Sequence, residues 1–526
     1  MSRPARPWTI GCGTNEGPPP PAQAIGGKAH NLARMAALGL PVPPAFVLGT
    51  DWCGRGDTLT PAEWAEPLRA LESACGLRVG DARRPLLLSV RSGAPVSMPG
   101  MMETLLNIGL CDVTVPGLLR LTGDPRLVWD SYRRLVSGYG EVVLGVPAAA
   151  FEADLAAIAG GVAERALDFA QLRALTRRHQ ETLAHAGTPF PQDPGEQLAG
   201  AIRAVFDSWQ SARAVAYRRL RDLPDAMGTA VTVQRMVFGN AGGMSGAGVG
   251  FTRHPSTGEP VPWVDFLLHA QGEDVVSGRR TAHGHDELAV RAPAVWAALR
   301  DALGRLEHEF RDMQDFEFTV QAGKLYLLQT RNGKRTPLAH ARITLDLLRE
   351  GLLSREEARA RTRELRAEDL QRHRVAASDG AQANLLARAT SACTGVASGS
   401  IALDEAAAKR AHDAGRPAIL VRETAETADI AALDHAAGLL TARGARTSHA
   451  AVVARQLGKV CLVGCPGLEI DMARQRVRLG GRELLADDVI TLDGDEGGVY
   501  LGLVQSVVET EQDLLNGLLA LRAGPP

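Results

Sequence analysis

The sequence predicts a multidomain α/β protein from three features of its 526 residues. Residues up to about 337 mix glycine-rich turns with short β-like runs such as Leu86–Val90. Within this part, residues 122–221 have fewer glycines and repeat apolar side chains at spacings of three and four, which is typical of helices. From Ile401 to about Gly502 short strand-like and helix-like runs alternate. The length alone predicts three or four domains, at about 100–200 residues each.

These features divide the chain into four predicted segments. The helical stretch rests on two sets of apolar residues, Phe151, Leu155 and Ile158, then Leu198, Ile202, Val205 and Phe206. Alternating charges between residues 355 and 365 predict a solvated helical connector. The predicted boundaries are 1–337 for an α+β domain with a helical subdomain at about 122–221, 338–385 for the connector, 386–503 for a compact β/α domain, and 504–526 for a tail helix.

Charge and cysteine usage narrow the class of protein. With 58 basic and 60 acidic residues the net charge is -2, so no overall field favours binding to nucleic acid or to an anionic membrane. The seven cysteines suit neither paired disulfides nor a zinc ribbon, and we expect buried, reduced thiols. No signal-peptide core and no run of eighteen apolar residues occurs. We therefore expect a cytoplasmic protein without a membrane partner.

A histidine at the start of a predicted helix is the first candidate for chemistry. His449 follows two possible N-cap residues, and Ala450–Arg455 carries the helix. The unpaired amides and the dipole of a helix start favour added negative charge there. Near neutral pH an imidazole is largely an unprotonated nucleophile, so His449 could accept a phosphoryl group. A capped surface histidine is the alternative. The loop around the candidate carrier comprises Arg443, Gly444, Arg446, Thr447 and Ser448.

A predicted β-hairpin between residues 311 and 331 is the second candidate. Residues two apart on a strand share a face, so Asp315 and Glu317 point the same way while phenylalanines fill the other side. Two carboxylates on one face suit Mg²⁺ that bridges phosphates. On the partner strand, Gln329 and Arg331 would bind phosphate beside the metal. The alternative is an ordinary solvated face of a hairpin.

Three further places offer groups for a nucleotide. Glycines in Phe238–Arg253 can turn backbone amides toward phosphate oxygens. Lys28 stands at a predicted helix start, and Arg91 follows an apolar strand. Each basic residue taken singly is equally explained as a surface charge. The loop residues predicted to contact phosphate are Gly242, Gly243, Ser245 and Gly246.

Together these features resemble the pyruvate, phosphate dikinase family. The resemblance is carried by Val90–Thr104, Ala270–Gly278, Leu328–Thr336 and the histidine segment 441–465. It implies an ATP-grasp nucleotide-binding domain, to which Glu273 contributes, and a swivelling phosphohistidine domain with His449 as the carrier. It further implies ATP, inorganic phosphate and Mg²⁺ as ligands. AMP and pyrophosphate would be the products.

Several positions depart from the family pattern. Ala445 and Arg446 replace a glycine and a methionine, Glu103 replaces an aspartate, and Ser391–Gly395 replaces the usual entry to the phosphohistidine domain. Full-length members continue into a barrel that binds pyruvate or phosphoenolpyruvate, whereas this sequence ends at Pro526. We therefore expect the ATP half-reaction, with hand-over to pyruvate through a separate barrel subunit.

Two other functions remain open at this stage. One is a dikinase for a different small acceptor, similar to rifampin phosphotransferase. The other is a regulatory or ATP-binding protein in which phosphorylation of His449 is a signal. The amphipathic tail could dock a barrel partner or pack back on the connector. The tail residues near one face are Val507, Leu514, Leu515, Leu518 and Leu519.

Overall fold

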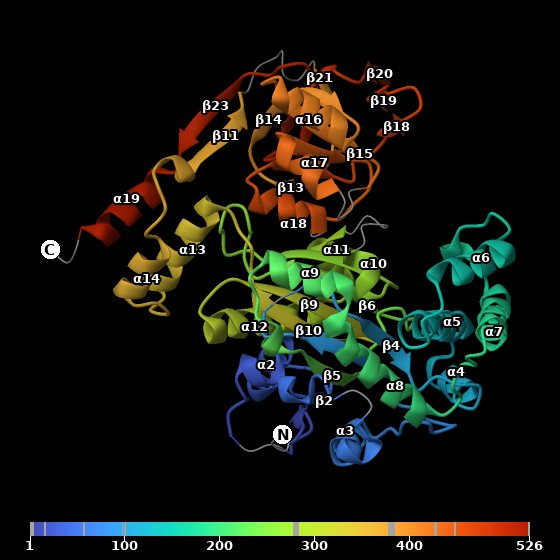
Figure 1. The fold of residues 1–526 in the computed structure, drawn as a ribbon. Coiled ribbons are helices and arrows are strands. Elements are labelled where there is room, and N and C mark those ends of the chain that lie inside the picture. The colour runs from blue at the N-terminus through green and yellow to red at the C-terminus, as the bar shows by residue number, and fades with distance from the viewer. Residues whose placement is uncertain are drawn as a thin grey trace. The chain divides into compact units, whose positions relative to one another are not determined.

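The computed structural model describes residues 5–14, 17–55, 58–96, 98, 101–276, 283–376, 384–424, 429–446 and 449–523 (Figure 1). The chain forms two compact units. Unit 1 comprises Met1–Ser245 and Tyr326–Thr330, and unit 2 comprises Gly246–Leu325 and Arg331–Pro526. The mixture of helices and sheets confirms the predicted α/β multidomain class. Within the described part of the chain, none of the helices has the length and apolar character needed to cross a bilayer.

Unit 1 is built on a five-stranded sheet with the order β1-β2-β5-β3-β4. All neighbouring strands are antiparallel. The predicted strand at Leu86–Val90 is present but begins two residues later, as β3. The strands are β1 (Trp8–Ile10), β2 (Ala45–Leu48), β3 (Leu88–Gly93), β4 (Thr104–Ile108) and β5 (Ala230–Arg235).

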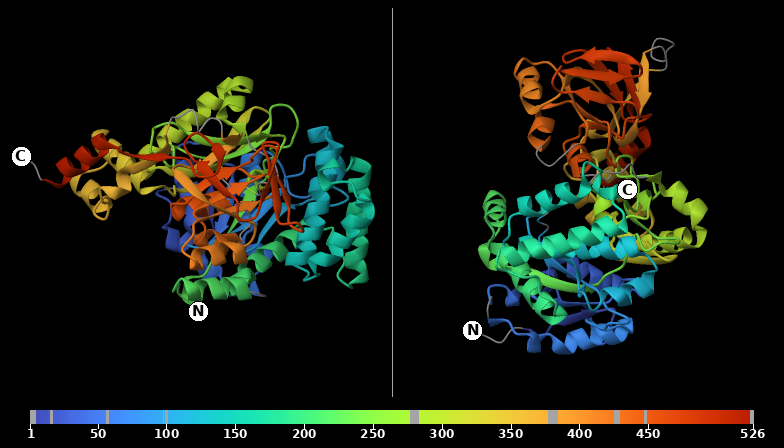
Figure 2. Two further views of the ribbon diagram at one scale, coloured as in Figure 1. Left: turned by 90° about the horizontal axis from the view of Figure 1, so that it is seen from above. Right: turned by 90° about the vertical axis from the view of Figure 1, so that its right-hand side faces the viewer.

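Helices cover this sheet and form the predicted helical stretch. α5, α6 and α7 pack against one another and lie side by side in both sets of views (Figures 1 and 2). Phe151, Leu198 and Ile202 are buried, which confirms the apolar spacing that predicted helices here. The helices are α1 (Ala22–Ile25), α2 (Gly27–Ala37), α3 (Ala65–Cys75), α4 (Val115–Thr122), α5 (Pro125–Val142), α6 (Ala148–Ala159), α7 (Phe169–His185), α8 (Pro194–Asp207) and α9 (Ala212–Leu220).

The second five-stranded sheet has the order β10-β9-β6-β7-β8. The predicted hairpin is β9 and β10, and its turn places Ala322 and Gly323 at positive φ, 50° and 75°. Two successive positive φ values are what a tight two-residue hairpin turn requires. The elements are β6 (Gly246–Phe251), β7 (Trp263–Leu268), α10 (Gly272–Val276), β8 (His283–Gly284), α11 (His285–Arg291), α12 (Pro293–Phe310), β9 (Gln314–Gln321) and β10 (Lys324–Asn332).

The connector and the tail form one small assembly within unit 2. Leu514, Leu518 and Leu521 of α19 are buried with Leu338 and Leu345 of α13, so the tail helix packs back on the connector. A strand that the sequence did not predict precedes this helix: β23 pairs antiparallel with β11. The elements are α13 (Pro337–Arg349), α14 (Arg355–Arg361), β11 (Gln371–Val375), β23 (Ser506–Thr510) and α19 (Gln512–Arg522).

The predicted compact β/α domain contains an eight-stranded sheet with the order β12-β22-β21-β14-β15-β16-β17-β13. Four consecutive strands of this sheet, β14 to β17, are parallel. The elements of the sheet and its crossovers are β12 (Leu385–Arg388), β13 (Thr390–Cys393), β14 (Val396–Ala402), α16 (Glu405–Asp413), β15 (Ala418–Arg422), α17 (Ile430–His435), β16 (Gly438–Thr441), α18 (His449–Gln456), β17 (Val460–Val463), β21 (Val489–Asp493) and β22 (Gly498–Leu501). A separate three-stranded sheet consists of β18 (Glu469–Asp471), β19 (Arg476–Leu479) and β20 (Arg482–Leu485).

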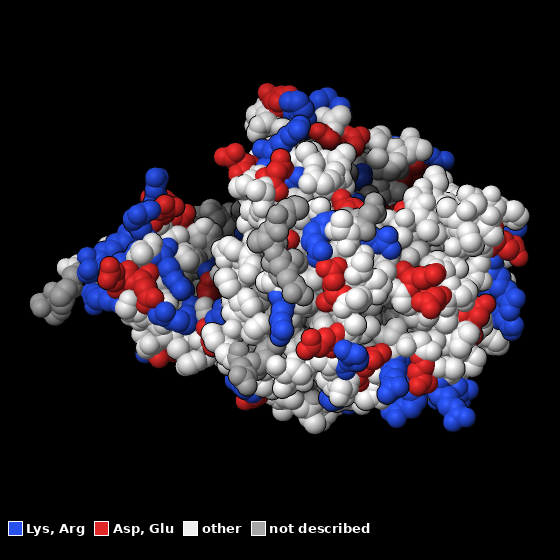
Figure 3. Space-filling view, turned by 60° about the horizontal axis from the view of Figure 1, so that its bottom comes forward, with Lys and Arg blue, Asp and Glu red and all other residues white. Residues whose placement is uncertain are grey.

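The surface and the thiols agree with the composition. On the face drawn in Figure 3, basic and acidic side chains are interspersed, as expected for a net charge of -2. All seven cysteines are free. The prediction of buried thiols is correct for four of them, Cys111, Cys393, Cys461 and Cys465.

Candidate active site

The two predicted metal carboxylates lie on β9. Phe316 and Phe318 are fully buried, whereas Asp315 and Glu317 are half-buried on the other face. The alternation that the sequence predicted for this strand is therefore confirmed. The side chains of the pair point to the same side of the sheet, two residues apart.

The register of the sheet shows what else shares this face. Glu317 of β9 lies opposite Val249 of β6, which lies opposite Asp265 of β7. Residues directly opposite one another in antiparallel strands point to the same side. In the neighbouring row, Asp315 of β9 lies opposite Phe251 of β6, which lies opposite Trp263 of β7. These two rows place six side chains on one face of the sheet, Asp315, Glu317, Val249, Phe251, Trp263 and Asp265.

Asp315 is held by an arginine of the hairpin. The Nε of Arg331 donates to Oδ2 of Asp315 at 2.7 Å. Burial raises the pKa of the Asp315 carboxyl, the guanidinium opposes that shift, and Glu317 adds to it. A carboxylate with its pKa raised by burial and by a neighbouring acid gains from a bound cation.

The pair fits Mg²⁺ by the chemistry of its donors. Mg²⁺ prefers oxygen ligands and is often held by one or two carboxylates together with substrate phosphates. Among the described residues, at this pair as in the rest, no group of three His, Cys, Asp or Glu side chains is placed to hold a metal ion. Asp315 and Glu317 therefore suit a metal shared with a nucleotide rather than a complete protein cage.

Lys28 and Arg91 belong to unit 1, where helix α2 begins against the end of β3. The N–H of Gly27 donates to the carbonyl of Ala94 at 3.0 Å. Gly26 has φ 78°, and a Cβ there would lie 1.8 Å from the carbonyl oxygen of Gly93. Only glycine allows this approach. It brings Lys28, at the second position of α2, close to the strand that carries Arg91.

The glycine-rich segment divides into a loop and a strand. Gly242 and Gly243 have φ 73° and 53°, and open space surrounds the positions where their Cβ atoms would be. Ser245 is buried and donates to the carbonyl of Gly242 at 2.6 Å. Gly246 belongs to β6, where a Cβ would lie 2.2 Å from the ring of Phe266. Packing thus explains this glycine without a ligand.

Two other predicted nucleotide contacts lie on regular elements. Glu273 belongs to α10, and its side chain lies outside the described atoms. Gln329 is buried on β10. Their contribution to a nucleotide site stays a prediction.

The candidate carrier stands at the first residue of α18, as the sequence predicts for its helix start. His449 follows β16, a central strand of the parallel region. In parallel sheets, ligands bind beyond the carboxyl ends of the strands, where the following helices begin. Thr447 and Ser448, the predicted caps, lie outside the described residues. The backbone position of His449 therefore suits a phosphorylated side chain.

The two arginines of the carrier loop both have acidic partners. Arg443 pairs with Glu423 at 3.1 Å, and a positive φ of 147° at Gly444 follows it. Arg446 donates from Nε to Oδ1 of Asp265 at 2.6 Å. Arg446 thus contacts the sheet face that carries the predicted metal carboxylates.

A further arginine of α18 reaches the same face and was missed by sequence reasoning. Arg455 is fully buried, its guanidinium lies 5.3 Å from the ring centroid of Phe251, and it donates to the carbonyl of Ala392 at 2.6 Å. Burial lowers its pKa. The sequence signal that could have identified Arg455 is its place as the one arginine among the alanines and valines of α18. Contacts before and after His449 therefore hold α18 over this face.

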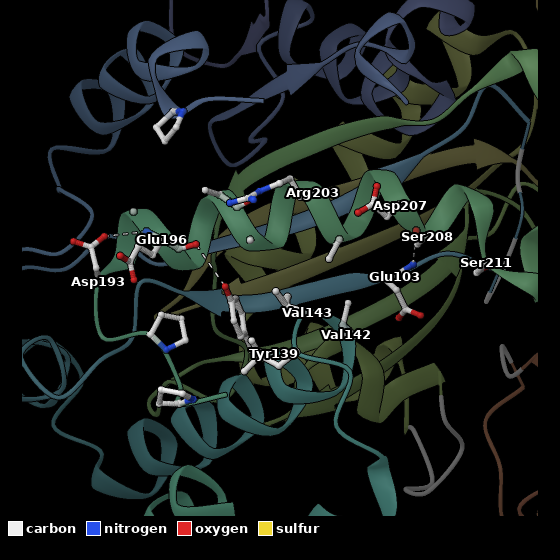
Figure 4. A pocket seen from close by; sticks show the side chains of 18 residues that line it. Glu103, Tyr139, Val142, Val143, Asp193, Glu196, Arg203, Asp207, Ser208 and Ser211 are labelled. Carbon is white, nitrogen blue, oxygen red and sulfur yellow. Dashed lines mark hydrogen bonds between the residues drawn. The ribbon is translucent and has the colours of Figure 1, made fainter. Parts of the chain in front are cut away.

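A cavity of about 1060 Å³ in unit 1 lies apart from these residues (Figure 4). Helix α8 contributes Glu196, Arg203 and Asp207 to its wall, and Tyr139 and Glu103 complete the opposite side. Carboxylates prevail in this lining, which does not suit a triphosphate. None of the predicted site residues lines it.

Comparisons with known proteins agree with this arrangement. Residues 57–299 match the AMP/ATP-binding domain of pyruvate phosphate dikinase, and residues 415–497 match the mobile domain of PEP-utilising enzymes. The chain is 42% identical to pyruvate, phosphate dikinase of Clostridium symbiosum over 505 residues, which is 94% of this chain and 57% of that protein.

Two further relatives show the same coverage. Pyruvate, phosphate dikinase 2 of Zea mays is 42% identical over 508 residues, with 94% of this chain and 57% of that protein aligned. The Rhizobium meliloti enzyme is 42% identical over 518 residues, with 94% and 58% aligned. The chain thus spans just over half the length of these relatives. On these matches, the chain belongs to the pyruvate, phosphate dikinase family.

Proposed function

We propose that this protein catalyses ATP-dependent phosphorylation of His449, with inorganic phosphate as the second acceptor. The observation that carries the proposal is the position of α18. Arg446 and Arg455, on either side of His449 in the sequence, contact the face of the sheet that presents Asp315 and Glu317. The names of the relatives, all pyruvate, phosphate dikinases, support the same reaction.

The proposed mechanism relies on positioning and charge. Lys28, Arg91 and Arg331 would neutralise the triphosphate, and Asp315 and Glu317 would hold Mg²⁺. The metal, when bound, supplies charge stabilisation for the phosphoryl group in transfer. The imidazole of His449 attacks, and the amides at the start of α18 stabilise the phosphohistidine. Such positioning and preorganised charge account for most catalysis of phosphoryl transfer.

The proposed products follow from a balanced reaction. The imidazole of His449 attacks the β-phosphorus, the bond between the α- and β-phosphates breaks, and AMP leaves, so that the β- and γ-phosphates remain together on the histidine. Inorganic phosphate then attacks the γ-phosphorus, the bond between the β- and γ-phosphates breaks, and pyrophosphate leaves while the β-phosphoryl group stays on His449. A protein that transferred only the γ-phosphoryl group would release ADP instead.

The final acceptor is a finer part of the proposal. We assign pyruvate as the final acceptor of the phosphoryl group. The names of the relatives support pyruvate as the acceptor, and the aligned residues cover 57% of the Clostridium symbiosum protein. Transfer to another small molecule and use of the phosphohistidine as a signal are the outcomes against which this assignment is tested.

An assay of adenine nucleotides tests the proposal. With ATP and Mg²⁺, AMP should form with phosphate and fall sharply without it, and the protein should carry an acid-labile, base-stable phosphoryl group. ADP as the main product would contradict the dikinase reaction. Phosphorylated protein is then mixed with pyruvate, alone and with a pyruvate-binding barrel protein. Phosphoenolpyruvate formed in either mixture would support pyruvate as the acceptor, and its absence in both would favour another acceptor.

A further inference from the structure

The guanidinium of Arg446 lies against β7, where it makes two hydrogen bonds and a cation–π contact. Its Nε donates to Asp265 at 2.6 Å, and its NH2 group donates to the carbonyl of Val264 at 2.7 Å. The guanidinium carbon lies 4.0 Å from the ring centroid of Trp263. A charge-assisted bond, a second hydrogen bond and a cation–π contact thus combine on one side chain. We name Trp263, Val264, Asp265 and Gly284 the arginine seat.

A glycine lies beside the guanidinium in the seat. Gly284 of β8 lies opposite Asp265 in the register. A Cβ at Gly284 would lie 3.4 Å from the NH2 group of Arg446, at the limit of ordinary van der Waals contact. The missing side chain leaves room for the guanidinium beside the carboxylate.

The ion pair between Arg446 and Asp265 is largely buried. Asp265 is 1% exposed and the side chain of Arg446 is 16% exposed. Removing one member of a buried ion pair costs far more than removing one member of an exposed pair. The exposed pair between Arg443 and Glu423 in the same loop provides the contrast, with side chains 64% and 59% exposed.

The seat lies where it can position the carrier. Arg446 precedes His449 by three residues, and Asp265 shares its sheet face with Glu317, separated by the single residue Val249 across β6. Two strand spacings correspond to roughly 10 Å. A methionine at this position could neither pair with Asp265 nor donate to the carbonyl of Val264.

We propose that Arg446 is a positioning residue that docks the carrier loop on the arginine seat and thereby holds the start of α18 over the carboxylate face. This role rests on the proposed phosphorylation of His449. Arg446 acts through the loop and does not itself contact the reacting atoms.

Hydrogen exchange on the full-length protein without nucleotide tests the docking directly. Arg446→Met should increase exchange in peptides covering residues 438–446, 450–457 and 260–268. Arg446→Lys, which keeps the charge without the planar fork, should give an intermediate increase. Arg474→Met is the matched control, because Arg474 is an exposed residue of the same domain. Exchange equal to that of the control would overturn the docking role.

Single-turnover phosphorylation tests the functional consequence. Arg446→Met should slow labelling at saturating ATP by at least tenfold, with little change in ATP affinity, because positioning acts on the transfer step. Arg474→Met should label at the wild-type rate. An unchanged rate in Arg446→Met would contradict the positioning role even if exchange increased.

A double variant separates positioning from folding. Arg446→Met alone places a methionine against the buried Asp265, and this can lower the unfolding temperature. Asp265→Asn with Arg446→Met removes that charge and should recover much of the unfolding temperature but not the labelling rate. Recovery of both would show that Arg446 is only structural. If the wild-type protein is not labelled at all, the proposed function fails, and the exchange experiment still decides whether Arg446 docks the loop.

Discussion

At the scale of single residues, two aspartates on one sheet face have different arginine partners. Asp315 accepts from Arg331 of the adjoining hairpin strand, whereas Asp265 accepts from Arg446, which is 181 residues away in the sequence. Strand alternation was enough to predict that Asp315 and Glu317 share a face. No local pattern could predict the partner of Asp265, because that contact depends on how distant elements pack.

Replacing either carboxylate of the pair by its uncharged amide should lower the rate of phosphorylation strongly. Glu317→Gln and Asp315→Asn should each lower the phosphorylation rate by well over tenfold, a factor that corresponds to about 1.4 kcal/mol of barrier. ATP affinity should fall less, since the proposed metal acts most on the charge in transfer. Rates are measured at limiting Mg²⁺, with the exposed Glu356→Gln as the control. Near-wild-type rates for both variants would show that the pair is only a solvated strand face.

His254 makes the protein sensitive to acid. Burial lowers its pKa to about 3, and the nearby cations Arg455 and Arg446 contribute to that shift. Its Nδ1 accepts from the backbone N–H groups of Ser256 and Thr257 at 3.2 and 3.1 Å. A nitrogen that accepts both bonds must be unprotonated. The folded protein therefore keeps this imidazole neutral at pH values where an unfolded chain would protonate it.

The sign of the pH effect follows from this difference. Between about pH 3 and 6.5 the unfolded state binds the proton and the folded state does not, so stability falls as the pH is lowered through this window. From pH 7 to pH 5 the free energy of unfolding should fall by up to about 2 kcal/mol through this residue. His254→Asn should remove most of that dependence in urea unfolding, since its amide oxygen can accept the same bonds. The exposed His373→Asn is the control, and an equal pH dependence in both variants would refute the assignment.

At the scale of elements, the glycines of β6 serve packing. Gly246, Gly248 and Gly250 alternate with buried larger residues, and Cβ atoms on them would meet the rings of Phe266, Phe318 and Phe316. The sequence suggested phosphate contact for Gly246, because glycine-rich runs occur in phosphate loops. A run of glycines with period two instead indicates a strand crossed by aromatic side chains.

A substitution in β6 separates the two explanations. In Gly248→Ala the new Cβ would lie 2.3 Å from Phe318, and we expect a loss of about 1–3 kcal/mol in the free energy of unfolding. Gly304→Ala in α12 is the control, because open space surrounds that position and a helical alanine is favoured by about 0.5–1 kcal/mol. Unfolding curves that rank the two variants in the opposite order would contradict the packing explanation.

Sequence patterns predicted the tail helix in part and did not predict the strand that precedes it. The apolar spacing of Val507–Leu521 predicted a helix with one apolar face, and Leu514 and Leu518 are buried against α13. The start of that prediction was wrong, because Val507 belongs to strand β23 and is exposed. Leu519 is also exposed, so only part of the predicted face packs. The strand β23 was missed because its partner, β11, lies 131 or more residues earlier. Pairing at that distance leaves no periodic signal within either segment.

At the scale of the whole molecule, local sequence patterns and longer sequence motifs predicted different properties. The fold class, the helical stretch and the hairpin followed from local patterns, and the family followed from a few long motifs. The division into compact units did not follow, because unit 2 joins β6 to β9 with the connector and the phosphohistidine domain. Long-range contacts such as those of Arg253 with Glu307 and Glu350 contribute to this joining. Such contacts become visible only in three dimensions.

The central claim is that His449 carries the phosphoryl group that ATP loses from its β position. The most direct measurement uses ATP labelled separately in the β- and γ-phosphates, with Mg²⁺ and phosphate, followed by mapping of the labelled peptide. The account predicts β-label on the peptide that contains His449, γ-label in pyrophosphate, and no labelled protein in His449→Ala with ATP binding retained. Label that persists on His449→Ala, or γ-label on the protein without β-label, would contradict the account.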